Sequence, residues 1–174
     1  MLYTLPGIPA ESKSMPSAPG SVTGTTRVVS VRECLFCRIV GGETPARTVL
    51  ETPEAVGFLD NRPVFKGHVL LVPREHVATF TDLPDRLRDP FFAAGQRVAA
   101  GMVIALGAQG SFVAMNNTVS QSVPHLHLHV VPRTKGDGLR GFFWPRHKYS
   151  SDKEMQEYAE RLAAAIQDDP TRGD

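Results

Sequence analysis

The run HLHLHVV at residues 125–131 constrains this chain most, because histidine and leucine alternate in it. With six histidines in 174 residues, three at a given set of alternate positions would arise by composition about four times in 100,000. Successive side chains of a β-strand point to opposite faces, so the pattern predicts a strand that buries its leucines. The imidazoles of His125, His127 and His129 would then share the other face, roughly 6.6 Å apart, and look into a cleft.

Three interpretations of this histidine face are open. One is a partly exposed strand of hydrogen-bonded histidines, although three aligned imidazoles are costly to bury without a use. Another is a metal site made from the histidines alone. We favour the third, chemistry at phosphorus, because neutral imidazole is nucleophilic near pH 7 without a separate base. Just upstream, Asn116-Asn117 and Gln121-Ser122 place amide, hydroxyl and backbone donors where phosphate oxygens would lie.

The segments around the histidine run predict an α+β sandwich with an antiparallel sheet, one long helix and a C-terminal helix. Hairpin strands followed by a long helix and further strands are typical of this class. The long helix is predicted to start at the Asp-Pro pair and to end at Gly107, and Ser151 with Glu154 forms a capping box for the last helix. The expected helices are 34–40, 89–106 and one from 151, and the expected strands are 47–51, 55–60, 67–73, 111–115 and 125–131.

Composition divides the chain and excludes several classes of protein. Residues 1–30 are rich in Pro, Gly, Ser and Thr and predict a flexible arm, before a domain at 31–150 and a C-terminal helix and tail at 151–174. A net charge of +1 argues against a nucleic-acid binder that works through bulk charge. No apolar run reaches the ~18–20 residues that cross a bilayer, and no secretory signal is visible. We therefore expect a cytoplasmic protein with no membrane or nucleic-acid partner.

The two cysteines, Cys34 and Cys37, form a C-x-x-C pair that has several interpretations. A redox pair, half of a metal site and two buried thiols are all consistent with it. A closed structural zinc site needs four ligands. His76 and His125 could complete such a set, and two thiolates with two neutral imidazoles would neutralise Zn²⁺.

The pattern His-φ-His-φ-His-φ-φ, preceded here by QSV and followed by Pro132-Arg133, resembles the histidine triad (HIT) superfamily of nucleotide hydrolases and transferases. The similarity extends upstream through CLFCRIVGGETPA and AVGFLDNRPVFKGHVLLVPREH, and it covers roughly residues 34–138. The resemblance implies a HIT-like sandwich that dimerises into one continuous sheet and takes a purine nucleotide. It also implies zinc bound by Cys34, Cys37, His76 and His125, as in the branch that carries C-x-x-C.

The resemblance also assigns roles within the site. His127 would be the nucleophile, His129 and Ser122 would contact the phosphate, and Ser122 would help to protonate the leaving group. His68 would support the same cleft. The nucleotide-binding residues would be Asp60 on the ribose, Phe36, Ile39 and Phe58 around the base, and Asn116, Gln121 and Ser122 near the phosphate. This chain departs from the family at a shorter NNTVSQ loop, at Ser120 where glycine is common, and at Asn61 where an apolar residue is common.

These features predict an enzyme that cleaves a nucleotide at its α-phosphorus. The substrate would be a nucleoside phosphoramidate or a dinucleoside polyphosphate, and the intermediate a nucleotidyl-histidine on His127. No carboxylate cluster indicates a catalytic Mg²⁺. A nucleotidyltransferase of the same superfamily and a nucleotide-binding module stabilised by zinc remain alternatives.

Overall fold

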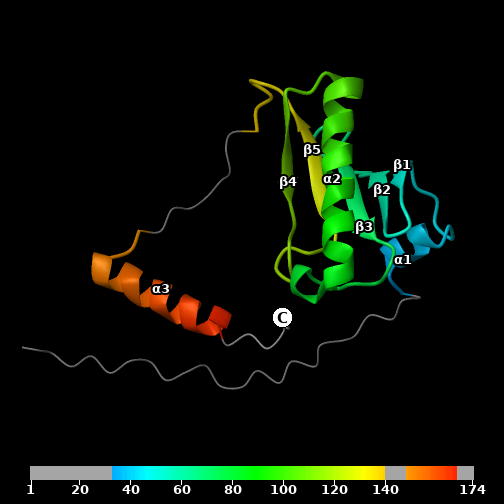
Figure 1. The fold of residues 1–174 in the computed structure, drawn as a ribbon. Helices are drawn as coiled ribbons and strands as arrows, with labels where there is room; N and C mark the ends of the chain where they lie inside the picture. Colours follow the sequence, from blue (N-terminus) through cyan, green and yellow to red (C-terminus); the bar gives the residue numbers. More distant parts are fainter. Residues whose placement is uncertain (1–32, 140–147, 168–174) are drawn as a thin grey trace, which may run out of the picture. The chain divides into compact units, whose positions relative to one another are not determined.

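The structure is a computed structural model that describes residues 33–139 and 148–167 (Figure 1). The predicted arm at 1–30 lies outside the described residues. The chain divides into two units, residues 1–132 and 133–174, and each is described by itself. The first unit holds nearly all of the sheet and the helices that cover it, and the second holds the C-terminal helix.

The sheet has five strands in the order β1-β2-β3-β5-β4. Three described pairings, β1 with β2, β2 with β3, and β3 with β5, are antiparallel. The prediction of an α+β fold with an antiparallel sheet is therefore confirmed. The strands are β1 (Thr48–Glu51), β2 (Ala55–Leu59), β3 (Val69–Pro73), β4 (Gly110–Ala114) and β5 (Leu128–Arg133).

Alternate residues of the sheet pack into two different cores. Val69 and Leu71 of β3 join the core that faces α2 (Asp85–Leu106), the long helix in Figure 1. Leu70 and Val72 face the other way and pack with Phe36 of the short helix α1 (Leu35–Val40). The period of two in β3 thus gives one strand two apolar faces, as expected of a central strand that is covered on both sides.

The long helix begins one turn before the predicted start. It runs from Asp85, and Pro90 lies inside it. Leu87 and Phe91, four residues apart, are both buried against the sheet, so packing extends the helix through the proline at the loss of one backbone hydrogen bond. The predicted end is confirmed, because Gly107 adopts the left-handed conformation with φ 64°.

The histidine strand begins later than predicted. Its first ladder residue is Leu128, which pairs with Leu71 of β3. Before it, the Leu126 N–H donates to the carbonyl of Val77, and the His125 N–H to that of Val123, in a turn. Residues 125–127 therefore precede the strand, and the described hydrogen bonds of their backbone N–H groups lie outside the strand ladders.

The C-terminal helix α3 (Asp152–Gln167) forms where the capping pattern predicts it. The Glu154 N–H donates to Ser151 Oγ over 3.1 Å, but the Glu154 carboxylate accepts from Ser150 and not from Ser151. Half of the predicted box is therefore present, and the other half is displaced by one residue. Among the described residues, the apolar and helical stretches are all too short or too polar to cross a membrane.

Candidate active site and metal centre

His127 is held in an orientation that leaves one ring nitrogen free. Its side chain is buried, with 3% exposed. Its Nδ1 lies 2.8 Å from the main-chain carbonyl of His125, and because a carbonyl only accepts, Nδ1 carries the proton. In neutral imidazole the other nitrogen, Nε2, then keeps its lone pair. The local fold therefore selects the tautomer whose Nε2 can act as a nucleophile.

Beside His127 lies a chain of polar groups that ends at a carboxylate. His68 Nε2 is 3.0 Å from His129 Nδ1, and His68 Nδ1 is 3.3 Å from Asp60 Oδ2. The Val64 N–H also lies 3.3 Å from His68 Nδ1. The rings of His127 and His129 are 4.9 Å apart between centroids. The three groups come from the end of β2, the start of β3 and β5, so the sheet brings together residues that are distant in sequence.

Burial keeps the imidazoles in this cluster neutral. Desolvation, aided by the neighbouring His127 and His68, lowers the pKa of His129 to about 4, and Asp60 only partly opposes this. The pKa of His68 is also lowered, mainly by burial, with Asp60 acting in the opposite direction. At pH 7 both rings are uncharged, which preserves their capacity to accept as well as donate a proton.

A pocket of about 470 Å³ opens on the α1 side of the sheet. Phe36 forms part of its wall and makes edge contacts with the rings of Phe58, 5.5 Å away, and His127, 5.3 Å away. Four residues predicted to hold the base and ribose line this pocket: Phe36, Ile39, Phe58 and Asp60. The apolar walls with one carboxylate at the edge suit an aromatic ring attached to a polar sugar.

The loop before the histidines is held by its own side chains. Gln121 accepts a hydrogen bond from the Thr118 N–H and donates to the carbonyl of Ala78, both over 2.8 Å. Thr118 and Ser120 have φ of 63° and 61°, in the left-handed region that favours glycine. This conformation explains why glycine suits position 120. Both ends of the Gln121 amide are thus already engaged in shaping the loop.

Two predicted phosphate contacts, Asn116 and Ser122, lie in the same region but are exposed. Within the described part of the chain, neither side chain has a hydrogen bond, and no contact joins either of them to the histidines. Their predicted role as phosphate contacts therefore stays a prediction, as it does for Gln121.

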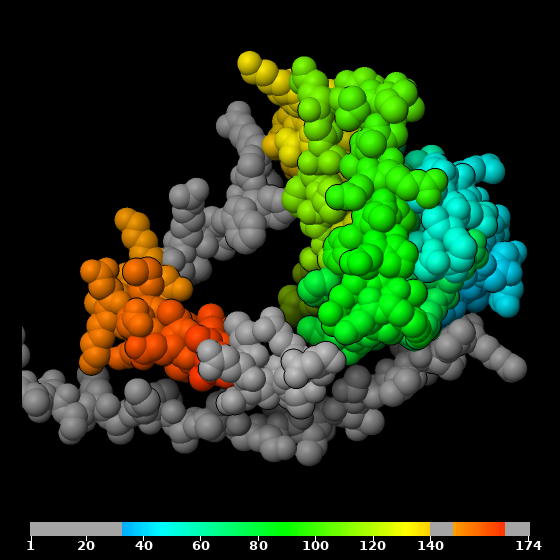
Figure 2. All heavy atoms as spheres, viewed as in Figure 1, coloured from blue at the N-terminus to red at the C-terminus, as the bar shows by residue number. Residues whose placement is uncertain are grey.

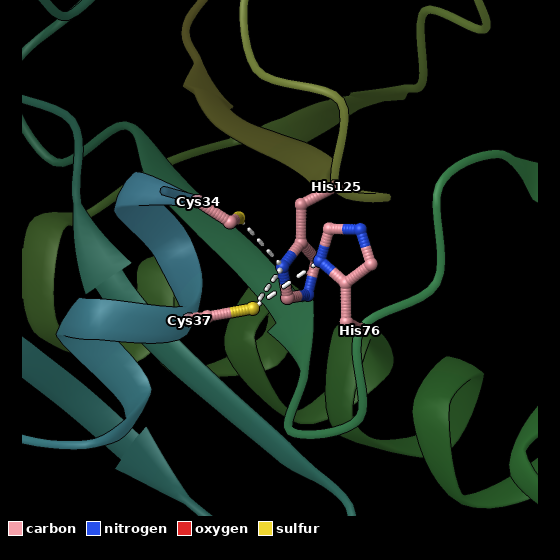
Figure 3. A group of neighbouring side chains, drawn as sticks. All are labelled: Cys34, Cys37, His76 and His125. Atoms are coloured by element: carbon pink, nitrogen blue, oxygen red, sulfur yellow. Dashed lines mark hydrogen bonds between the residues drawn. The ribbon is translucent and has the colours of Figure 1, made fainter. Parts of the chain in front are cut away.

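Four residues form a compact metal-binding arrangement, shown in Figure 3. Cys34 and Cys37 come from the start of α1, His76 from the loop after β3, and His125 from the segment before β5. The four donor atoms all lie within 4.8 Å of one another. Cys37 Sγ is 3.2 Å from His76 Nδ1, and Cys34 Sγ is 3.4 Å from His125 Nδ1. The predicted ligand set is therefore brought together.

The chemistry of these donors fits a cation. His125 donates its Nε2–H to the carbonyl of Pro73 over 2.9 Å, which leaves Nδ1 bare and directed at the cysteines. Desolvation lowers the pKa of His125 to about 4, so the ring is neutral, as a ligand must be. Burial, with Cys34 adding to it, raises the pKa of Cys37 to about 12. Without a cation the Cys37 thiol stays protonated, whereas a bound metal would stabilise its thiolate.

Sequence reasoning missed several residues that line the α1-side pocket. Leu35 and Leu70 complete its apolar wall, and Arg47 is the one cation that lines it within the described residues. Leu70 lies on the same face of β3 as the histidine cluster, which the alternation of that strand indicates. Arg47 carries no such signal, because its place at the pocket depends on how the segment before β1 folds back.

The comparisons with known proteins agree with this geometry. The HIT domain profile matches residues 41–136. The adenosine 5′-monophosphoramidase hnt1 of Schizosaccharomyces pombe is 31% identical over 135 residues, which cover 76% of this chain and 98% of that protein. A HIT family protein from Bacillus subtilis has a TM-score of 0.68 at 32% identity, covering 75% of this chain and 95% of its own. A zinc-bound histidine triad family protein from Mycobacterium smegmatis has a TM-score of 0.60 at 34% identity, covering 80% and 100%. Because the HIT domain profile spans more than half of the 174 residues, this chain belongs to the HIT domain family.

Proposed function

We propose that this protein is a nucleotide hydrolase that cleaves a nucleoside phosphoramidate or a dinucleoside polyphosphate at the α-phosphorus. One observation carries the proposal: the Nδ1–H of His127 is fixed on the His125 carbonyl, which leaves Nε2 bare, and the His127 ring contacts Phe36 in the wall of a pocket suited to a nucleoside. The phosphoramidate is the first substrate to test, because relatives that are about 31% identical are named adenosine 5′-monophosphoramidases.

The reaction would proceed in two displacements. His127 Nε2 attacks the α-phosphorus, a phosphorus–nitrogen bond forms, and the bond to the amine or phosphate leaving group breaks. Water then attacks the nucleotidyl-histidine, releases the nucleoside monophosphate and returns Nε2 to its free state. The leaving group needs a proton in the first step, and we assign its delivery to Ser122 or His129, which flank the nucleophile in sequence.

His68 would set the position of the proton on the His129 ring. If the Val64 N–H donates to His68 Nδ1, then His68 carries its proton on Nε2 and donates it to His129 Nδ1. His129 then carries its own proton on Nε2, where it can face a phosphate oxygen or the leaving group. In this arrangement His68 is a positioning residue. Asp60 would accept from the ribose hydroxyls, because a carboxylate has lone pairs beyond those facing His68 and the Arg62 N–H.

We further propose that the four-residue cluster holds a structural zinc ion. Two sulfur and two nitrogen donors make a closed tetrahedral set, which leaves no position for water or substrate. The metal would therefore supply stability and no chemistry at phosphorus. It would tie α1, which carries Phe36 of the α1-side pocket, to His125, which orients the nucleophile.

Intact-protein mass spectrometry tests the proposal directly. The purified full chain is mixed with an adenosine phosphoramidate or a diadenosine polyphosphate and quenched within milliseconds, beside His127→Ala and His129→Ala. We expect a transient adenylyl adduct on the wild type and on His129→Ala, and none on His127→Ala. Equal metal content and circular dichroism spectra would show that the variants are folded. Turnover without an adduct on any time scale would contradict the covalent route.

Simple measurements distinguish the alternative functions and test the expected oligomeric state and location. Product formation that depends on added phosphate or another acceptor would identify a transferase. Saturable nucleotide binding without product would identify a binding module. Light scattering tests the expected homodimer, and fractionation of cells tests the expected cytoplasmic location.

A further inference from the structure

A second cavity lies on the opposite side of the sheet from the α1-side pocket. It has a volume of about 550 Å³ and runs between α2 and the β1–β3 part of the sheet. Figure 2 shows the face of the molecule on which α2 (green) borders the β1–β2 segment (cyan). We call this cavity the α2 groove. Its lining residues are Val49, Leu50, Leu59, Lys66, Gly67, Val69, Arg97, Val98, Gly101, Met102, Ala105 and Leu106.

The walls of the α2 groove expose apolar side chains, and a ligand that removed this surface from water would be stabilised there. Val49 is 52% exposed, Leu106 54% and Leu59 40%, and all three line the groove. Exposed apolar residues that gather around one concave surface are typical of a binding site. The volume of the groove also lies within the range of small-molecule sites, roughly 300–1,000 Å³.

Gly101 gives an independent reason to expect an occupant. A glycine inside a helix is less stable than alanine there. Here a Cβ at position 101 would meet no atom within 4 Å, so no neighbour within the described chain requires the glycine. Gly95 of the same helix differs, because a Cβ there would lie 2.8 Å from Leu128. The space above Gly101 is therefore open toward the groove, and a ligand can approach the helix backbone there.

The charged residues of the α2 groove are both cations. Lys66 and Arg97 are exposed at its edge, and its lining contains no acidic residue. Within the described residues neither cation forms a salt bridge, although seven other pairs do. An apolar body with one anionic end complements this surface in shape and charge. We propose that the α2 groove binds an amphipathic small-molecule carboxylate, of the class of a medium-chain fatty acid, with its carboxylate at Lys66 and Arg97.

The α2 groove adjoins the catalytic cluster through the β2–β3 connection. Leu59 lines the groove and precedes Asp60, and Gly67 lines it and precedes His68. Gly67 has a φ of +94°, and a Cβ there would lie 2.5 Å from the Leu106 side chain. An occupant that shifts Leu59 or Gly67 would also shift the Asp60–His68 pair, because each of them is the preceding residue in the chain. We expect bound carboxylate to change kcat of the nucleotide reaction, an expectation that rests on the proposed function. Binding itself does not rest on it.

Calorimetric titration of the full chain with decanoate, below its micellar concentration, tests the binding. We expect saturable binding of one decanoate per chain, about tenfold tighter than binding of the neutral decanol. The double variant Lys66→Gln with Arg97→Gln should bind decanoate no better than decanol, whereas Lys153→Gln in α3 should leave binding unchanged. Equal affinity of the wild type for decanoate and decanol would overturn the assignment of the carboxylate.

Filling the groove provides the second arm of the test. Gly101→Leu should weaken decanoate binding at least about tenfold, and Ala100→Leu, on the same helix but outside the groove lining, should not. Thermal unfolding and metal content of both variants would report whether they are folded. Undiminished binding by a folded Gly101→Leu would overturn the proposal. So would a halved mass of this variant in light scattering, because the groove would then hold a second copy of the chain. Decanoate binding without any effect on nucleotide turnover would support the binding site and contradict only its coupling to Asp60 and His68.

Discussion

Replacing His76 with alanine tests whether the proposed metal centre affects His127. His76 contributes a ring nitrogen to the four-residue cluster but does not line the α1-side pocket. His125 belongs to both parts of the site: its imidazole faces the cysteines, and its carbonyl accepts the Nδ1–H of His127 over 2.8 Å. A change at His76 should therefore affect His127 through the position of His125.

The size of the effect follows from the bond at stake. A hydrogen bond of this kind contributes about 0.5–1.5 kcal/mol net. With only three ligands left, we expect the metal to be lost and His125 to move. Loss of the hydrogen bond between His127 Nδ1 and the His125 carbonyl would then lower kcat/KM roughly two- to twelvefold. If His127 is the proposed nucleophile, its removal in His127→Ala should lower kcat/KM far more, by roughly 10⁴-fold or more. An intermediate loss is thus the signature of misorientation.

The assay is steady-state hydrolysis of an adenosine phosphoramidate, combined with metal analysis and NMR of the His127 ring. Glu75→Ala is the matched control, because Glu75 is the neighbour of His76 and its carboxylate pairs with Arg86 at the surface. We expect Glu75→Ala to keep metal, activity and the Nδ1–H signal. A His76→Ala protein that has lost its metal but keeps full kcat/KM and an unchanged ring signal would refute the coupling.

Three further predictions concern stability. Ser120→Gly relieves a left-handed residue at φ 61° and should stabilise the fold by about 0.5–1 kcal/mol in urea titrations; an unchanged midpoint would contradict the strain. Gly101→Ala should stabilise the protein by up to about 1 kcal/mol. Gly95→Ala should destabilise it by about 1–3 kcal/mol, because the new Cβ would lie 2.8 Å from Leu128. The two variants should therefore shift the midpoint of thermal unfolding in opposite directions. The pKa of His129 is lowered from 6.5 to about 4 in the folded protein, so as the pH falls the unfolded chain binds a proton at this residue before the folded chain does. The contribution of His129 to stability is therefore complete above pH 6.5 and is lost as the pH falls toward 4. A urea midpoint that stays constant over this pH range in the metal-loaded protein would refute the prediction.

Much of the fold follows from local patterns in the sequence. The apolar strand β3, the helix end at Gly107 and the short helix α1 at the C-x-x-C pair depend on signals within a few residues, and each lies where the sequence predicts it. The family motif also predicts residues of the α1-side pocket, and Phe36 and Asp60 do line it.

The differences arise where distant residues compete with a local signal. The start of β5 depends on its pairing with β3, so the alternation of His125 and His127 does not extend the ladder. Pro90 predicts a helix start, but the burial of Leu87 overrides it. The α2 groove is lined by residues from position 49 to position 106, and no local pattern connects them.

The spacing of the four proposed metal ligands has a consequence for the biosynthesis of the chain. Cys34 and His125 are 91 residues apart, so both thiols leave the ribosome well before the last ligand is made. At a typical rate of about 5–20 residues per second, that interval lasts roughly 5–18 s. During this interval the C-x-x-C pair would have only two of the four proposed ligands, and its thiols can bind other soft metals or be oxidised. The order of translation thus places the most reactive residues first, and supply of the correct ion matters most before the sheet has closed.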